Sequence, residues 1–199
     1  MKEIIQNALQ DSFSYTEYRK LASDLVAQGK PTGHDLSEAL AHYAELNETR
    51  MNRLEKTITL TDAVIQKLQN CSKNTIWLVL VESWCGDAAQ IVPVINKMSE
   101  VSESIQLKIV LRDDNDSLMQ QFLTNGGKAI PKLIVLDAQT LQVVAHWGPR
   151  PQGAKQLIED YKSAHGTVDE AGKIELQKWY LHDKGISIQE EISEIMSQF

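Results

Sequence analysis

One cysteine of this sequence lies in a context that supports thiol chemistry. The segment Trp84-Cys85-Gly86-Asp87-Ala88 has the first half of a C-x-x-C dithiol site, but alanine stands where the second cysteine would fall. A short apolar run ends just before this segment and helical spacing follows it, so the sequence predicts Cys85 at a strand-to-helix junction. Unpaired N–H groups and the positive end of a helix dipole favour a thiolate there. Cys85 is therefore the candidate nucleophile.

Neighbouring residues limit what Cys85 can do. Because Ala88 cannot resolve a mixed disulfide on Cys85, an external thiol has to do so. Asp87 places a negative charge beside the thiol, and we predict that it raises the pKa of Cys85. The other cysteine, Cys71, precedes an expected strand of some eight residues, which separates the two cysteines by roughly 25 Å. A disulfide requires Cα atoms within about 7 Å, so we expect Cys71 to be a small, buried or half-buried hydrophobic residue. The alternative for Cys85 is a structural cysteine without chemistry.

Apolar periodicity predicts helices first and alternating strands and helices afterwards. The expected elements are helices over the first 70 residues, strands at 75–81, 105–111, 132–136 and 141–147, helices between them and up to residue 165, and two helices from about residue 169. The order of elements from residue 75 is β-α-β-α-β-β-α, with a helix at 117–123. Alternation predicts parallel strands with right-handed crossovers, and the terminal hairpin adds an antiparallel edge. The fold class is therefore α/β.

Composition excludes several classes of function. The chain has 199 residues and a net charge of −7, and its Lys and Arg residues are mixed with Asp and Glu, which argues against a nucleic-acid partner. No apolar run reaches the roughly 18 residues that a membrane helix needs, and no signal-peptide core is visible. Two cysteines are too few for a disulfide framework, so we expect a cytoplasmic protein. The five histidines form no metal-spaced cluster and no nucleotide-binding glycine motif is present, so we expect no metal and no cofactor.

The Trp84-Cys85-Gly86 segment, the order of elements and the proline that opens the third strand, Pro131, together resemble the thioredoxin fold. The resemblance covers roughly residues 60–165. Within that superfamily the W-C-G-D-A site is similar to a branch of bacterial thioredoxin-like proteins. The expected organisation is a thioredoxin-like domain at residues 61–166, with helical extensions at residues 1–60 and 167–199.

The resemblance implies a role for each residue of the site. Cys85 would be the attacking thiol, and Asp87 would adjust its pKa. Pro131 would be a cis-proline facing Cys85, although a proline is also tolerated at the start of a strand. Backbone groups of Ile130 would bind an extended substrate, and Gly148 would let that substrate approach closely. The expected substrate-binding residues are Trp84, Gly86, Ile130, Pro131, Trp147 and Gly148.

Two functions fit these residues. The first is a monothiol thiol-disulfide oxidoreductase in bacterial redox homeostasis, whose partner is a protein or a low-molecular-weight thiol or disulfide. The second is a catalytically degenerate adaptor that holds a peptide between Trp84, Pro131 and Trp147. A glutathione-transferase-like enzyme is disfavoured because few residues follow the fold, and a peroxiredoxin because Glu82 stands where that family has threonine. His146 and Arg150 flank the expected groove and could aid an anionic substrate, but we expect a surface role for each.

Overall fold

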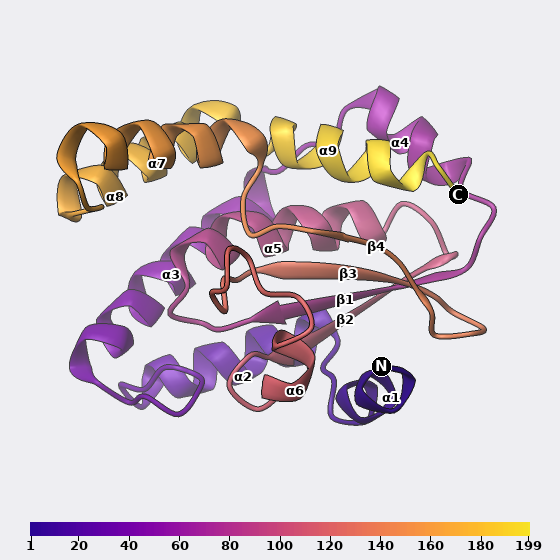
Figure 1. The fold of residues 1–199 in the computed structure, drawn as a ribbon, viewed down its shortest axis with the longest axis horizontal. Helices are drawn as coiled ribbons and strands as arrows, with labels where there is room; N and C mark the ends of the chain where they lie inside the picture. The colour runs from indigo at the N-terminus through magenta and orange to yellow at the C-terminus, as the bar shows by residue number, and fades with distance from the viewer.

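The computed structural model describes residues 1–199 and has a four-stranded mixed sheet with the strand order β2-β1-β3-β4 (Figure 1). The strands are β1 (Thr75–Val81), β2 (Ile105–Leu111), β3 (Lys132–Asp137) and β4 (Val143–Trp147). Strand β2 is parallel to β1, whereas β3 is antiparallel to β1 and β4 is antiparallel to β3. The predicted α/β fold class with a thioredoxin-like mixed sheet is confirmed.

The expected parallel orientation of the third strand is wrong. The helix expected at 117–123 is a four-residue helix, α6 (Asp116–Met119), followed by a turn. A parallel connection needs a crossover that carries the chain back along the sheet, usually on a full helix. Because α6 is too short for that, the chain remains at the end of the sheet where β2 finishes. Strand β3 therefore starts beside the end of β1 and runs in the opposite direction.

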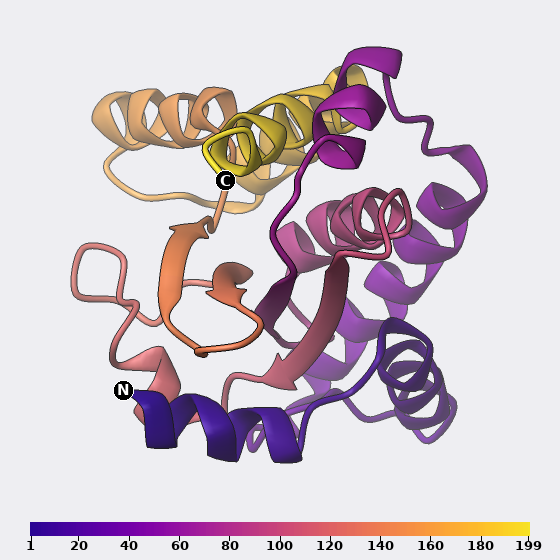
Figure 2. The same cartoon turned by 90° about the vertical axis from the view of Figure 1, so that its right-hand side faces the viewer.

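Helices cover the sheet on both sides, as Figures 1 and 2 show. Helix α5 packs along one side between α3 and α9, and α1 and α2 contact β2. Helix α3 belongs to the segment that the sequence assigns to an N-terminal extension, and α9 to the C-terminal one. The remaining helix bounds are α1 (Lys2–Gln10), α2 (Tyr15–Ala27), α3 (Glu38–Thr57), α4 (Asp62–Gln69), α5 (Gly86–Ser99), α7 (Gln152–His165), α8 (Glu170–Asp183) and α9 (Ile186–Met196).

Strand β1 forms the centre of the core because all seven of its residues are buried. Its continuous apolar sequence fits a strand covered on both faces. Cys71, just before this strand, is also buried and is a free thiol whose Sγ contacts the carbonyl oxygen of Met196. The prediction that Cys71 is a buried, unpaired residue is confirmed.

The outer edge of β2 is covered by the segment that joins α1 to α2. Phe13 and Ile109 exchange two backbone hydrogen bonds of 2.8 Å, which form an antiparallel bridge. No helix of the protein has the length and apolar content needed to cross a membrane.

Candidate functional site

Cys85 is the N-cap residue of α5, directly after the loop that leaves β1. Its Sγ accepts the backbone N–H of Ala88 at 3.4 Å and donates to the carbonyl oxygen of Ile130 at 3.3 Å. The residue is only 8% exposed, and its thiol is free. The thiol therefore lies at the predicted helix start, but in a largely dry environment.

Burial raises the pKa of Cys85 to about 12, and the Asp87 carboxylate contributes further in the same direction. The N–H of Ala88 and the charge of Arg150 lower the pKa of this thiol, but by less than burial and Asp87 raise it. The expectation that the helix start lowers the pKa of this thiol is therefore wrong. Loss of hydration in the buried N-cap position outweighs the helix N-terminus. As predicted, Asp87 raises the pKa of Cys85.

Asp87 is buried beside Cys85 and has two partners from distant parts of the chain. Arg150 lies with Nη2 2.7 Å and Nε 2.8 Å from Oδ2 of Asp87, and the Tyr180 hydroxyl donates to Oδ1 at 2.8 Å. Burial alone would lower the pKa of Arg150, but the Asp87 carboxylate raises it above its ordinary value. The expectation of a surface role for Arg150 is wrong, because its guanidinium is the counter-ion of the site.

The loop before Cys85 is held by a buried polar network. The Thr32 hydroxyl donates to a carboxylate oxygen of Glu82 and accepts the N–H of Ser83 at 2.7 Å. Asn47 of α3 donates from its amide to the carbonyl of Ser83 at 2.8 Å. Glu82 also accepts the backbone N–H of Asp113 at 2.9 Å. These contacts fix the position of Trp84 and Cys85 relative to α3 and β2.

The Ile130–Pro131 peptide bond is cis, which confirms the prediction for this proline. Both residues are buried, and Ile130 presents its carbonyl oxygen to the thiol of Cys85. Gly148 has a φ of +108°, and a Cβ at this position would lie 2.4 Å from the carbonyl oxygen of Pro131. Gly148 therefore permits a close approach of the protein's own backbone at Pro131, whereas the expectation was a close approach of a substrate backbone.

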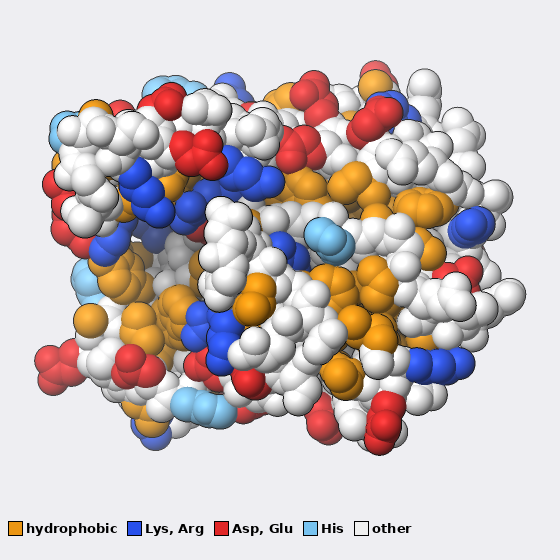
Figure 3. Space-filling model, in the orientation of Figure 1, with side chains coloured by type: hydrophobic (Ala, Val, Ile, Leu, Met, Phe, Trp, Pro, Cys, Tyr) orange, Lys and Arg blue, Asp and Glu red, His pale blue; other side chains and the backbone are white.

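The thiol is reached through a cavity of about 680 Å³ between α3 and α8. Figure 3 shows this side of the molecule hollowed, with Lys and Arg side chains above apolar ones. Among the expected site residues, the lining includes Trp84, Cys85, Gly86 and Asp87. Ile130, Pro131, Trp147 and Gly148 do not line it. The structure thus brings the first four residues to one cavity and leaves the other four outside its lining.

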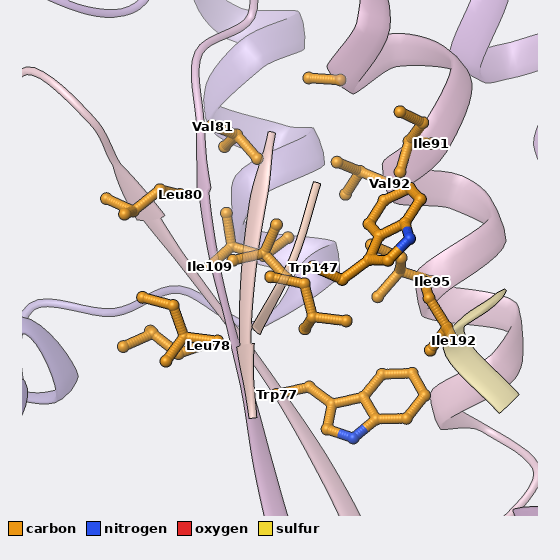
Figure 4. Close-up of a cluster of buried hydrophobic side chains, with 14 of the residues drawn as sticks. Trp77, Leu78, Leu80, Val81, Ile91, Val92, Ile95, Ile109, Trp147 and Ile192 are labelled. Atoms are coloured by element: carbon orange, nitrogen blue, oxygen red, sulfur yellow. The ribbon is translucent and has the colours of Figure 1, made fainter. Parts of the chain in front are cut away.

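Trp147 is a core residue. Its indole lies with Val92, Ile95 and Trp77 in the buried cluster between the sheet and the helices (Figure 4). Its Nε1 donates to Oε2 of Glu191 at 2.7 Å. This side chain therefore does not line the Cys85 cavity, although it was expected among the substrate-binding residues.

Trp84 is half-buried at the cavity, where its ring lies 4.7 Å from the Arg112 guanidinium carbon. Sequence reasoning assigned no role at the site to Tyr180, Asn47 or Thr32. Tyr180 is 93 residues from Asp87, so no local spacing signals their contact. Asn47 carried a weak signal, because it is a polar residue within the apolar stripe of α3.

A sheet of this topology, with a cysteine at the first helix start and a cis-proline beside it, defines a thioredoxin-fold protein. The family model described as Thioredoxin matches residues 33–162, and the chain belongs to this family. The matched segment begins before α3, so it includes a helix that the sequence assigns to the N-terminal extension.

The chain is similar to two solved structures, of which the first shares its fold. The crystal structure of an HIV epitope-scaffold is 18% identical with a TM-score of 0.59, covering 94% of this chain and 99% of that one. A protein of unknown function from Pseudomonas aeruginosa is 21% identical with a TM-score of 0.44, covering 90% of this chain and 99% of its own. No curated protein matches the chain.

Proposed function

We propose that the protein is a monothiol thiol-disulfide oxidoreductase that acts through Cys85. The observation that carries this proposal is the position of the Cys85 thiol. Cys85 is the N-cap residue of α5, and its Sγ faces the carbonyl oxygen of Ile130. The residue also borders a cavity large enough for a small molecule.

The reaction requires no second cysteine. Cys85 loses its proton and its thiolate attacks a disulfide R–S–S–R′, which forms Cys85–S–S–R and releases R′S⁻, the group that takes up a proton. A thiolate R″S⁻ from solution then attacks the R sulfur, which forms R–S–S–R″ and releases the Cys85 thiolate. Two disulfide bonds form and two break, so no other oxidant or reductant is needed.

The high pKa of Cys85 limits the rate of this reaction. With a pKa of about 12, roughly one thiol in 100,000 is ionised at pH 7. A thiolate of high pKa is intrinsically more nucleophilic, which compensates for about half of this deficit on a logarithmic scale. The proposed exchange is therefore slow at neutral pH and accelerates as the pH rises.

The alternative is a non-enzymatic adaptor that uses the same fold without thiol chemistry. The buried, protonated state of Cys85 favours this alternative. The groove expected for a peptide does not, because Pro131 and Trp147 are buried and Trp84 alone of the three borders the cavity.

One experiment separates the two functions. The protein is incubated with an oxidised low-molecular-weight thiol at several pH values, and adducts are measured by intact mass. The Cys71→Ser variant keeps Cys85 as the only thiol, and Cys85→Ser keeps only the buried Cys71. We expect one adduct on Cys71→Ser that free thiol reverses, and none on Cys85→Ser. The absence of an adduct on Cys71→Ser would leave the adaptor as the function.

A further inference from the structure

The cavity above Cys85 is formed by facing sides of two helices that are far apart in sequence. On α3 the lining residues recur every three or four positions, which places them on one helix face. Helix α8 lines the facing side of the cavity with seven residues between Glu170 and Leu181. The α3 residues are Leu40, Tyr43, Leu46, Arg50 and Arg53.

This cavity concentrates exposed apolar side chains. Six large hydrophobic residues of the protein are exposed, and three of them, Leu46, Ile174 and Leu181, line the cavity. Ile174 and Leu181 are 54% and 52% exposed. Contiguous exposed apolar surface usually marks a binding site.

Two cations of the cavity lack a carboxylate partner. Arg50 donates from Nη1 to the Asn47 side chain at 2.7 Å, but neither Arg50 nor Arg53 forms an ion pair in the structure. The other lining cations each contact an acidic side chain. These other cations are Arg150, Lys173 and Lys178. The half-buried guanidinium of Arg50 is therefore available to an anion.

The cavity is bounded at one end and at its floor by polar contacts between helices. Tyr43 of α3 donates to Glu170 of α8 at 3.1 Å, and Lys173 donates to the Tyr43 hydroxyl at 2.9 Å. On the floor, Gln90 of α5 donates to Gln177 of α8 at 2.8 Å. These contacts and the volume of about 680 Å³ fit a compact small molecule.

We propose that this cavity binds an organic anion with an apolar body. The anionic group would lie beside Arg50 and Arg53, and the chain or ring would contact Leu46, Ile174 and Leu181. When such a compound carries a disulfide, it belongs to the substrate class of Cys85. This last statement rests on the proposed function, whereas the binding itself does not.

The test of charge uses dodecanoate, a carboxylate with an apolar chain, and dodecyltrimethylammonium, a cation with a chain of the same length. Binding of each compound to the full chain is measured by isothermal titration calorimetry below its micellar concentration. The Arg50→Gln/Arg53→Gln variant removes the unpaired cations. The Lys56→Gln/Lys97→Gln variant removes the same charge from exposed positions outside the cavity.

We expect the arginine variant to bind dodecanoate about tenfold more weakly, because a contact to a charged group is lost. The lysine variant should bind like the unmodified protein, and the cation should not bind. Equal affinity in the two variants would overturn the proposal. So would equal binding of the cation, or an absence of dodecanoate binding to the unmodified protein.

The apolar wall is tested separately with the Ile174→Ser/Leu181→Ser variant. Its matched control is Leu36→Ser/Leu123→Ser, which changes two other exposed leucines that do not line the cavity. We expect weaker binding in the first variant only, with urea midpoints confirming that both variants are folded. Equal loss of affinity in both variants contradicts the proposal. Dodecanoate contains no sulfur, so retained binding together with absent disulfide exchange would count against the proposed function alone.

Discussion

The half-buried Arg150 forms an ion pair with Asp87, with Nη2 and Nε both within 2.8 Å of Oδ2. Asp87 lies two residues after Cys85, the only cysteine that borders the cavity. The two residues influence the thiol in opposite directions. Asp87 raises the pKa of Cys85, whereas Arg150 lowers it. This pair therefore offers two substitutions with opposite expected effects on the same thiol.

Replacing Asp87→Asn should lower the pKa of Cys85, because the repulsive charge is removed while Arg150 remains. The side chain keeps an oxygen that can accept the Tyr180 hydroxyl. In a Cys71→Ser background we expect alkylation by iodoacetamide at pH 8 to be about threefold faster for a pKa change of about one unit, because the tenfold gain in thiolate is offset by about half on a logarithmic scale by its lower nucleophilicity. Intact mass at successive times measures this rate. Equal or slower alkylation would show that the carboxylate does not suppress the thiolate.

Replacing Arg150→Gln should have the reverse effect on the thiol and should also destabilise the fold. The variant leaves Asp87 buried with only Tyr180 as partner, at a cost of about 2–3 kcal/mol. Urea unfolding measures the stability, and iodoacetamide measures the thiol. Lys128→Gln, which breaks an exposed ion pair with Asp116, is the control and should leave the stability nearly unchanged, because solvent screens exposed charges. Faster alkylation of the Arg150 variant under native conditions contradicts the assigned sign.

The alkylation rate of Cys85 should rise steeply with pH. With a pKa of about 12, the thiolate fraction increases about tenfold for each pH unit from 8 to 10. The Cys71→Ser variant isolates this signal. The folded pKa lies above the ordinary value of 9.0, so the thiol contributes stability that is present below about pH 9 and lost as the pH approaches 12. A rate that reaches a plateau below pH 10 would disagree with the burial of this thiol.

Gly148→Ala should destabilise the protein by about 2–4 kcal/mol, because the new Cβ meets the Pro131 carbonyl oxygen in addition to the strain of a positive φ. Gly166→Ala is the matched control, since Gly166 has a φ of +80° with nothing within 4 Å of a Cβ. The control should cost only about 1–2 kcal/mol. Urea midpoints compare the two. A control as unstable as Gly148→Ala would mean that the contact with Pro131 adds nothing.

Thr32→Val should destabilise the loop before Cys85 by about 2 kcal/mol, since it leaves Glu82 and the N–H of Ser83 without the threonine hydroxyl. Burial raises the pKa of Glu82, and the Thr32 hydroxyl opposes this effect. The pKa of Glu82 is higher in the folded protein than in the unfolded chain. Glu82 therefore stabilises the fold when the pH is below its pKa in the unfolded chain. This stabilisation is lost as the pH rises through its pKa in the folded protein. The variant should raise that pKa further.

The loss of stability in Thr32→Val should therefore be larger at pH 7 than at pH 5. Urea unfolding at both pH values tests this, with the exposed Thr57→Val as control. A loss that is independent of pH would show that the hydroxyl does not interact with the Glu82 carboxylate.

Much of the fold and part of the site could be predicted from local sequence. The continuous apolar run at Thr75–Val81 identified the central strand with its bounds, and the change to helical spacing placed Cys85 at the start of α5. The Ile130–Pro131 cis bond was predicted from the resemblance. These features depend on residues that are adjacent in the chain.

The features that were missed depend on contacts between distant elements. No periodicity encodes that Arg150 turns inward to Asp87, 63 residues away, or that Tyr180 reaches the same carboxylate. The pKa of Cys85 was expected to fall because the helix start is a local feature, whereas the burial that raises it comes from tertiary packing. The direction of β3 likewise depends on where the chain turns after α6.

The bridge between Phe13 and Ile109 has a consequence for association with other molecules. An uncovered outer strand has free N–H and C=O groups that can recruit a strand from a second molecule, which begins aggregation. The segment before α2 already occupies two of these groups on β2. The amino-terminal residues thus protect the β2 edge of the sheet against edge-to-edge polymerisation, a task that is independent of any chemistry at the thiol.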